Sequence, residues 1–433
     1  MKATLAVLTL LFSQFAFAQD AAMFRGNPQH TGVYEAAGVP KFSRVKWKFQ
    51  TGGRSYSSPA ISNGTAYVGS NDHFLYAVDL ATGTQKWKFE TASRVTSSPA
   101  VSGDTVYFGS MDANSYAVDA VTGKLKWKYT TAGERRYTAT HLHGAMPEAE
   151  AMPDPFDFYL SSPTVANGVV YFGSGDGNVY ALDAAGGQLK WKFQTGDVVH
   201  ASPAVANGTI FIGSWDSYLY ALDAATETQK WKFKTGEDPK IHNQVGLQSS
   251  PAVADGLVYV GCRDSNLYAV DAATGEKKWA FNNKGSWVIG SPAVHEGKVY
   301  FTTSDSAMFY ALDARTGTPV FSQAFTWPMF SSPAIAGKTL YLGTHEGKLM
   351  AIDLTTQKPA WTYQTDASKE FGPKYTSPNG KPNYNVAFRD FFYDDMIVGV
   401  DNLLSVGAIL SSPVVVGNVI YFASADGNLY ALE

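Results

Sequence analysis

The chain has 433 residues, of which 45% are hydrophobic and 14% are aromatic, and it contains 40 glycines and 20 prolines. This composition supplies a large core and many turns, and it is unlike that of a disordered chain. A net charge of −4 offers no basic surface for nucleic acid, and the single cysteine, Cys262, excludes an intramolecular disulfide, a haem-attaching cysteine pair and a thiolate metal cluster.

The N-terminus has the three parts of a secretory signal. Met1 and Lys2 precede an apolar run over residues 5–12, and Ala16 and Ala18 supply small residues for a cleavage site. We expect cleavage near Ala18, removal of residues 1–18, and a mature protein that is periplasmic or secreted. No later stretch reaches the ~18 apolar residues of a membrane helix, so no transmembrane segment is expected. Residues 19–40 form an N-terminal extension before the first repeat.

Eight Ser-Pro dipeptides in the rest of the chain each stand at the start of an apolar run. Self-similarity at a near-constant period indicates a repeat architecture. In each copy a turn such as Asn63-Gly64 leads to a β-branched and aromatic run and then to a segment like Leu-Tyr-Ala-Leu-Asp, which predicts short strands joined by hairpins. The anchoring prolines are Pro59, Pro99, Pro163, Pro203, Pro251, Pro292, Pro333 and Pro413.

A second pattern, Ala-x-Asp-x-x-Thr-Gly-x-x-x-Trp, links each copy to an outer strand, as in residues 77–87. Asp caps the turn, Gly supplies a positive φ, and the Trp ring packs between neighbouring sheets where Ala leaves room for it. Phe321 replaces Trp in one copy. The residues expected to dock neighbouring sheets are Trp47, Trp87, Trp127, Trp191, Trp231, Trp279 and Trp361.

The two ends of the repeat region complement each other. The eighth copy stops at Glu433 without its outer strand, whereas the segment 46–49 stands alone before the first copy. Pairing of these segments closes a ring and removes exposed strand edges. The sequence therefore predicts an all-β fold: an eight-bladed β-propeller of four-stranded antiparallel blades, formed as one domain by residues 41–433 and expected to be monomeric.

Three insertions interrupt the repeat, at about residues 132–160, 236–248 and 364–410. Each lies between an outer strand and the next inner strand, so all three belong to one face, where loops on a rigid scaffold usually carry function. In the third insertion, residues 374–380 predict a loop. Apolar residues then recur every four positions from Phe388 to Leu404, which predicts an amphipathic helix over 388–404 that packs either on the ring or on a partner.

Candidate binding residues gather on this same face. Arginine suits planar anions and imidazole titrates near neutral pH, so the group predicts a site for a polar or anionic ligand, and its histidines predict an alternative metal site. A polar rim without a ligand is the third possibility. The ligand candidates are Arg135, His141, His143, His200, Trp215, Asp216, His242 and Arg263, and the metal candidates are His141, His143, His200 and His242.

The repeat motif with its Ser-Pro-Ala openings resembles the repeat of pyrroloquinoline-quinone (PQQ) enzymes, over about residues 24–433. That resemblance implies the propeller fold, but the superfamily includes both quinoprotein alcohol dehydrogenases and non-enzymatic propellers of the BamB type, which take part in outer-membrane assembly. A shared fold does not decide between them.

A dehydrogenase of this family would hold PQQ and calcium, use an Asp base, and usually carry a vicinal disulfide, which one cysteine cannot form. Asp157, Asp390 and Asp394 are base candidates by location only. We therefore favour a non-catalytic exported module, without a cofactor, that binds or scaffolds an envelope protein, a glycan or a small polar ligand. A PQQ- and calcium-dependent dehydrogenase is the alternative.

Overall fold

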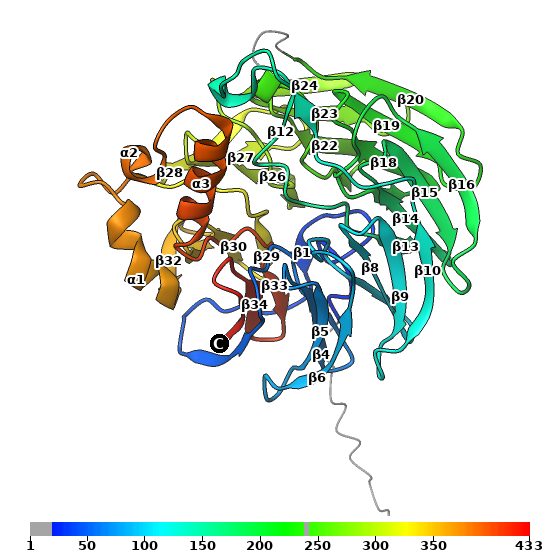
Figure 1. Cartoon of the computed structure of the whole chain (residues 1–433), viewed down its shortest axis with the longest axis horizontal. Helices are drawn as coiled ribbons and strands as arrows, with labels where there is room; N and C mark the ends of the chain where they lie inside the picture. The colour runs from blue at the N-terminus through cyan, green and yellow to red at the C-terminus, as the bar shows by residue number, and fades with distance from the viewer. Residues whose placement is uncertain (1–19, 238–241) are drawn as a thin grey trace, which may run out of the picture.

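A computed structural model describes residues 20–237 and 242–433, and the predicted signal segment 1–18 lies outside this part of the chain. Across the described residues, eight blades of four antiparallel strands each surround a central axis (Figure 1), and one blade gains a fifth strand from the N-terminal extension. The predicted eight-bladed propeller is thus confirmed. No helix in residues 20–237 or 242–433 is long and apolar enough to cross a membrane.

The first four blades follow the chain from the inner strand to the outer strand. They comprise β3 Ala60–Ser62, β4 Thr65–Gly69, β5 Phe74–Asp79 and β6 Gln85–Glu90; β7 Ala100–Ser102, β8 Thr105–Ser110, β9 Asn114–Asp119 and β10 Leu125–Thr130; β13 Thr164–Ala166, β14 Val169–Gly173, β15 Asn178–Asp183 and β16 Leu189–Gln194; β17 Ala204–Ala206, β18 Thr209–Gly213, β19 Tyr218–Asp223 and β20 Gln229–Lys234.

The last four blades repeat this order, and the eighth takes its outer strand from the N-terminal side of the chain. They comprise β21 Ala252–Ala254, β22 Leu257–Gly261, β23 Asn266–Asp271 and β24 Lys277–Asn282; β25 Ala293–His295, β26 Lys298–Thr302, β27 Met308–Asp313 and β28 Pro319–Ala324; β29 Ala334–Ala336, β30 Thr339–Gly343, β31 Lys348–Asp353 and β32 Lys358–Gln364; β33 Val414–Val416, β34 Val419–Ala423, β35 Asn428–Leu432 and β2 Val45–Gln50.

Pairing of β2 with β35 closes the ring. Trp47 lies opposite Ala431, and Val45 lies opposite Leu432, in an antiparallel register. An ion pair between Arg44 and Glu433 at 2.6 Å extends the contact beyond the strands. The predicted closure by the two ends of the repeat region is confirmed, and because of it β35 is not an edge strand.

The outer-strand tryptophans dock each blade on the next one. The indole Nε1 of Trp47, Trp87, Trp127, Trp191, Trp231 and Trp279 donates to a carbonyl of the following blade at 3.0–3.1 Å. A Cβ atom on Gly123 would lie 2.7 Å from the Trp87 ring, so this glycine makes room for the ring as well as providing a positive φ. Trp361 instead donates to the carbonyl of Val39, in the N-terminal extension, at 2.8 Å.

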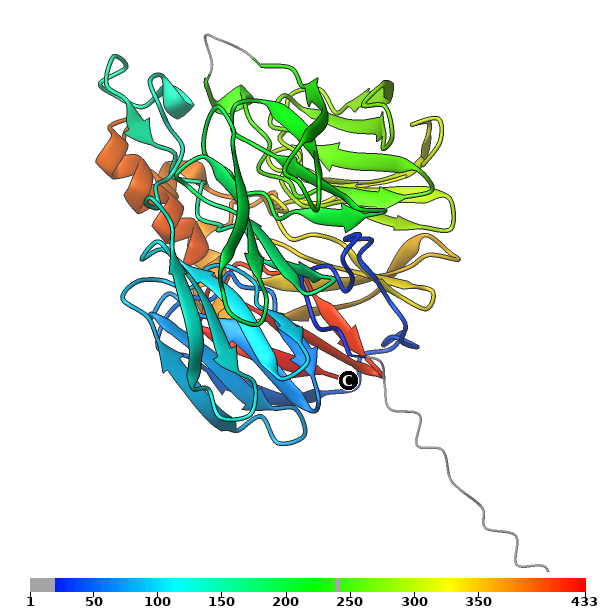
Figure 2. The same ribbon diagram turned by 90° about the vertical axis from the view of Figure 1, so that its right-hand side faces the viewer.

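The N-terminal extension crosses the inside of the ring. Carbonyls of residues 21–32 accept hydrogen bonds of 2.6–2.9 Å from Ile61, Val101, Val205, Val253, Val294 and Ile335, each in the inner strand of a different blade. Its short strand β1 Val33–Tyr34 pairs in parallel with β29. We call residues 20–34 the plug. Figure 2 shows this dark blue segment on the opposite side of the ring from α3 (Tyr393–Leu404).

The serines of the Ser-Pro dipeptides form a ring of hydrogen bonds around the axis. In seven of the eight steps around this ring, one serine N–H donates to the neighbouring serine hydroxyl at 2.8–3.2 Å. The channel inside them has a volume of only about 40 Å³, and Phe24 of the plug lines it. The hydrogen-bonded serines of the repeat thus narrow the channel along the axis of the ring.

The third insertion is more helical than its sequence indicates. The segment predicted as loop begins inside a helix, α1 Asp366–Tyr375, whose side-chain cap is Thr365. The predicted helix over 388–404 is too long, because α2 covers Tyr384–Ala387 and α3 begins only at Tyr393. Of the two predicted packing surfaces for this helix, the ring or a partner, one face of α3 uses the ring. Val400 and Leu404 pack in a core cluster with residues of the ring.

Candidate functional site

The first and third insertions meet over the ring axis and form a cap. Phe158 from the first insertion and Leu404 from α3 pack in one cluster with Phe330 of the ring. The first insertion contains the strands β11 Thr138–Ala139 and β12 Met152–Pro153 and the 3-10 turn η1 Leu142–Gly144. The backbone N–H of Met146 donates to the carbonyl of Phe391 at 2.8 Å, which joins the two insertions directly. We call residues 132–160 together with 364–410 the cap.

A fully buried ion pair holds the first insertion on the ring. The Nη1 atom of Arg263 lies 2.6 Å from Oδ2 of Asp154, and both side chains have no exposed surface. The guanidinium also lies between the rings of Trp215 and Trp287, 4.4 and 4.1 Å from their centroids. Burial opposes the charged form of Asp154, but Arg263, His143 and the backbone N–H of Phe156 together outweigh burial and lower the pKa of this carboxyl.

A second buried charge cluster lies beside the first. The His200 ring is hydrogen bonded at both nitrogens, with Nδ1 2.7 Å from Asp157 Oδ1 and Nε2 2.8 Å from Glu134 Oε1. Burial lowers the pKa of His200, but the two carboxylates outweigh this effect and raise that pKa to about 10. The protonated His200 ring therefore links the propeller to Glu134 and Asp157 of the first insertion.

The predicted ligand residues are partly brought together. Arg263 and Trp215 touch, and Nε2 of His143 lies 3.4 Å from the same Asp154 carboxylate, so these residues form one cluster around the insertion. Arg135 lies apart in an exposed ion pair with Asp197 at 2.8 Å. His141 is exposed.

Two further candidates lie in other settings. Asp216 accepts hydrogen bonds from Tyr220 at 2.6 Å and Gly196 at 2.7 Å, an arrangement that other blades repeat. His242 begins the 3-10 helix η2 His242–Gln244, and its side chain is outside the described part of the chain.

The His141-x-His143 pair lies in a turn and not in a strand. Both residues have a positive φ, 58° and 55°, in the turn at η1, so their rings do not project as alternate side chains of a strand. Within the described residues, no group of three or more His, Cys, Asp or Glu side chains is placed to hold a metal ion.

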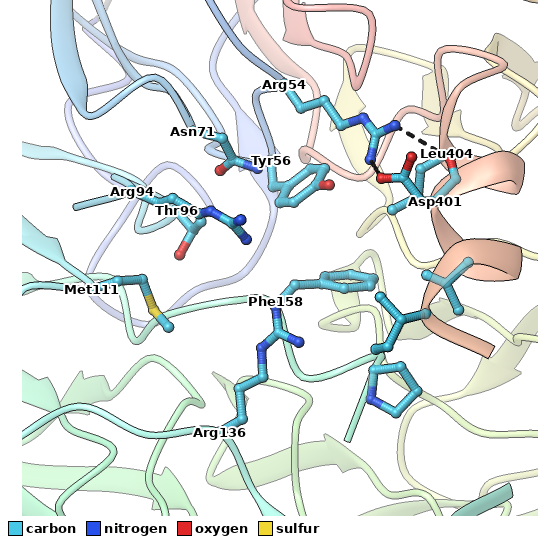
Figure 3. A pocket seen from close by; sticks show the side chains of 13 residues that line it. Arg54, Tyr56, Asn71, Arg94, Thr96, Met111, Arg136, Phe158, Asp401 and Leu404 are labelled. Carbon is cyan, nitrogen blue, oxygen red and sulfur yellow. Dashed lines mark hydrogen bonds and ion pairs between the residues drawn. The ribbon is translucent and has the colours of Figure 1, made fainter. Parts of the chain in front are cut away.

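A cavity of about 470 Å³ lies between the first two blades and the cap. Three guanidinium groups reach it: Arg54 and Arg94 from connections between blades, and Arg136 from the first insertion. Figure 3 shows Arg94 and Arg136 turned toward the space beside Tyr56 and Phe158. We call this space the arginine cavity. Its lining residues are Arg54, Tyr56, Asn71, Arg94, Thr96, Met111, Arg136, Pro155, Phe158, Ile397, Val400, Asp401 and Leu404.

A second cavity, of about 410 Å³, is lined by aromatic side chains of the ring and the third insertion, among them Trp287, Phe330 and Phe388. Two of its titratable groups are shifted by their burial. Burial raises the pKa of Asp305 and lowers the pKa of His345 to about 3, so both favour their neutral forms. We call it the aromatic cavity.

The arginine cavity was not predicted from the sequence, although the repeat contains a signal for it. Arg54 and Arg94 occupy the same repeat position, five residues before Pro59 and Pro99, and no other copy has a charged residue there. The equivalent residues elsewhere include Phe158 and Trp287, which pack in one cluster with Val400 of α3. A comparison of the copies position by position would have separated these two arginines from arginines elsewhere on the surface.

Comparisons with known proteins agree on the fold. The model of the family described as outer membrane protein assembly factor BamB matches residues 41–153, 158–282 and 263–382. BamB from Moraxella catarrhalis is similar in structure, with 16% identity, a TM-score of 0.66, and coverage of 90% of this chain and 99% of that chain.

Two alcohol-oxidising enzymes are similar in structure to the same degree. A europium-containing methanol dehydrogenase has 15% identity and a TM-score of 0.68, over 95% of this chain and 98% of that chain. Quinohemoprotein alcohol dehydrogenase from Comamonas testosteroni has 14% identity and a TM-score of 0.69, over 95% of this chain and 80% of that chain. No curated protein matches the sequence. At these identities the structural likeness establishes the fold alone.

Proposed function

The chain belongs to the family of outer membrane protein assembly factor BamB, and from this premise we propose that it is a non-catalytic binding module of the cell envelope that recognises a partner protein through its cap. A rigid ring with one elaborated face suits recognition, because the scaffold holds the loops that make contact. The periplasm is the location that the N-terminal signal pattern favours.

The observation that carries this proposal is an apolar tip on the cap. Met146, Phe391 and Phe392 are 42%, 67% and 55% exposed. Backbone pairing between the first and third insertions places them side by side, with Met146 bridged to Phe392. Exposed apolar groups gathered in this way mark interaction sites more often than isolated ones do.

The alternative, a dehydrogenase with PQQ and calcium on the axis, does not suit the residues present. Ligand pockets usually have volumes of about 300–1,000 Å³, whereas the axial channel has about 40 Å³. Asp157 is already bound by His200 and by the backbone N–H of Tyr137 at 2.6 Å. The other two base candidates, Asp390 and Asp394, are exposed.

The binding proposal is tested by removing the apolar tip. The double substitution Phe391→Ser and Phe392→Ser should abolish co-isolation of an envelope protein after chemical cross-linking in cells, without lowering the melting temperature. The matched control is Val121→Ser with Leu125→Ser, two exposed apolar residues beside the outer hairpin of the second blade. Equal co-isolation by both variants would contradict the proposal.

The enzyme alternative has a separate test. Purified protein supplied with PQQ and calcium should give no dye-linked oxidation of alcohols. Turnover that a chelator abolishes would contradict the non-catalytic proposal and would return Asp157, Asp390 and Asp394 to consideration as the base.

A further inference from the structure

The arginine cavity carries more positive charge than its own carboxylate balances. Arg54 pairs with Asp401 of α3, and it also donates to the Asp401 carbonyl at 3.2 Å. Arg94 and Arg136 form no ion pair with a carboxylate of the described residues. Three guanidinium groups therefore face one carboxylate, in a chain whose net charge is −4. Such a local excess of one sign concentrates ions of the opposite sign.

Two polar atoms in the cavity wall lack partners. Thr96 is only 4% exposed, and its hydroxyl is buried without a hydrogen bond. The side-chain oxygen of Asn71 is likewise buried and unpaired. A buried polar atom without a partner costs free energy, which a ligand that supplies the partner recovers. Thr96 can donate to an anion, and Asn71 can accept from a hydroxyl group.

The remaining wall of the cavity is apolar. Tyr56 and Phe158 provide aromatic rings whose centroids are 5.3 Å apart, and Val400 and Leu404 of α3 also line the cavity. Figure 3 shows these rings next to the two free guanidinium groups. A ligand in this space meets charge on one side and a flat hydrophobic surface on the other, as ligands with ring or chain carbons require.

We propose that the arginine cavity binds a small organic anion that also carries hydroxyl groups, a sugar acid or a sugar phosphate. The carboxylate or phosphate lies between Arg94 and Arg136, and the Thr96 hydroxyl donates to it. A ligand hydroxyl donates to Asn71, while the carbon skeleton packs on Tyr56 and Phe158. A volume of about 470 Å³ accommodates a monosaccharide of this kind. This site is separate from the apolar tip and goes beyond the proposed protein recognition.

Isothermal titration of the full mature chain tests the proposal with three probes. Gluconate supplies a carboxylate, glucose 6-phosphate supplies a phosphate, and uncharged glucose supplies hydroxyls alone. We expect saturable binding of at least one of the two anions and none of glucose. Arg94→Gln should weaken that binding by about tenfold or more, because it removes a charge-assisted contact, and the Arg94→Gln, Arg136→Gln double variant should abolish it.

The matched control is Arg315→Gln, an exposed arginine after β27, on the face opposite the cap. It should bind the anion as the unaltered chain does. Far-ultraviolet circular dichroism checks that the variants fold, and Arg94→Lys, which keeps the charge, should retain part of the affinity if the double variant does not fold. Absence of binding by both anions, or equal binding by the double variant and the unaltered chain, would overturn the proposal.

Discussion

The plug and the cap close the ring axis from opposite faces, but they are held by different forces. The plug pairs its backbone carbonyls with the inner strands of six blades, and its buried Arg25 has Nε and Nη1 atoms without partners. The cap is held by side chains of opposite charge, Asp154 with Arg263 and His200 with Glu134 and Asp157. Backbone pairing tolerates many sequences, whereas the cap depends on particular residues. The cap is also the side that has the two larger cavities and the apolar tip.

Removing the plug should have the largest effect. Deletion of residues 20–34 removes at least six backbone hydrogen bonds to six different blades. At roughly 1 kcal/mol for each bond, the free energy of unfolding should fall by about 6 kcal/mol. Urea unfolding of the mature chain and the truncated chain measures this difference. A loss below about 2 kcal/mol would mean that the plug does not hold the blades together.

Breaking the buried ion pair of the cap should cost less. Arg263→Met leaves Asp154 buried without its counterion and removes the cation between Trp215 and Trp287. We expect a loss of about 3–5 kcal/mol in the free energy of unfolding, the usual cost of an unpaired buried charge. Urea unfolding followed by tryptophan fluorescence reports both the loss and the changed surroundings of the two rings. An unchanged midpoint would contradict the role of this pair.

The second charge cluster makes stability depend on pH. The pKa of His200 is about 10 in the folded protein against an ordinary value of 6.5, so the folded state holds this proton more tightly. The stability that this proton provides is complete below pH 6.5 and is lost as pH rises through 10, by a few kcal/mol in total. The measurement is urea unfolding at both ends of that window. In His200→Gln the free energy of unfolding should depend less on pH in that window. A slope equal to that of the unaltered chain would contradict the role of His200 as a charged link.

The matched substitution on the plug side should have the smallest effect. Burial lowers the pKa of Arg25 to about 10, and this side chain has no carboxylate partner in the described residues. Arg25→Met removes a charge that nothing balances, so the free energy of unfolding should change by about 1 kcal/mol or less. A loss as large as that of Arg263→Met would show that the plug relies on a side-chain contact after all.

The sequence was sufficient for the ring but not for the cap. Ser-Pro anchors and outer-strand tryptophans act within one repeat or between neighbouring repeats, so their spacing predicts their contacts. His200 and Arg263 are paired with Asp157 and Asp154 in an insertion that has no repeat pattern. Sequence spacing has no information on such pairs, because only the folded cap brings them together.

The helix α1 and the plug were missed for local reasons. Gly372 and Pro373 lie inside α1 and are unfavourable in a helix, so the sequence of residues 366–375 does not indicate one, although the first turn is capped by Thr365. The plug has little strand pattern of its own, because inner strands of other blades supply its hydrogen bonds. A Pro or Gly can be accommodated where the neighbouring structure fixes the backbone.

The most direct test of the account is to map which face the partner touches. A photo-cross-linking amino acid at Phe392, on the cap, is compared in cells with the same amino acid at Asn207, in the exposed β17–β18 hairpin of the opposite face. We expect one discrete cross-linked envelope protein from position 392 and none from position 207. Cross-links from position 207 alone, or equal cross-links from both positions, would contradict the assignment of binding to the cap.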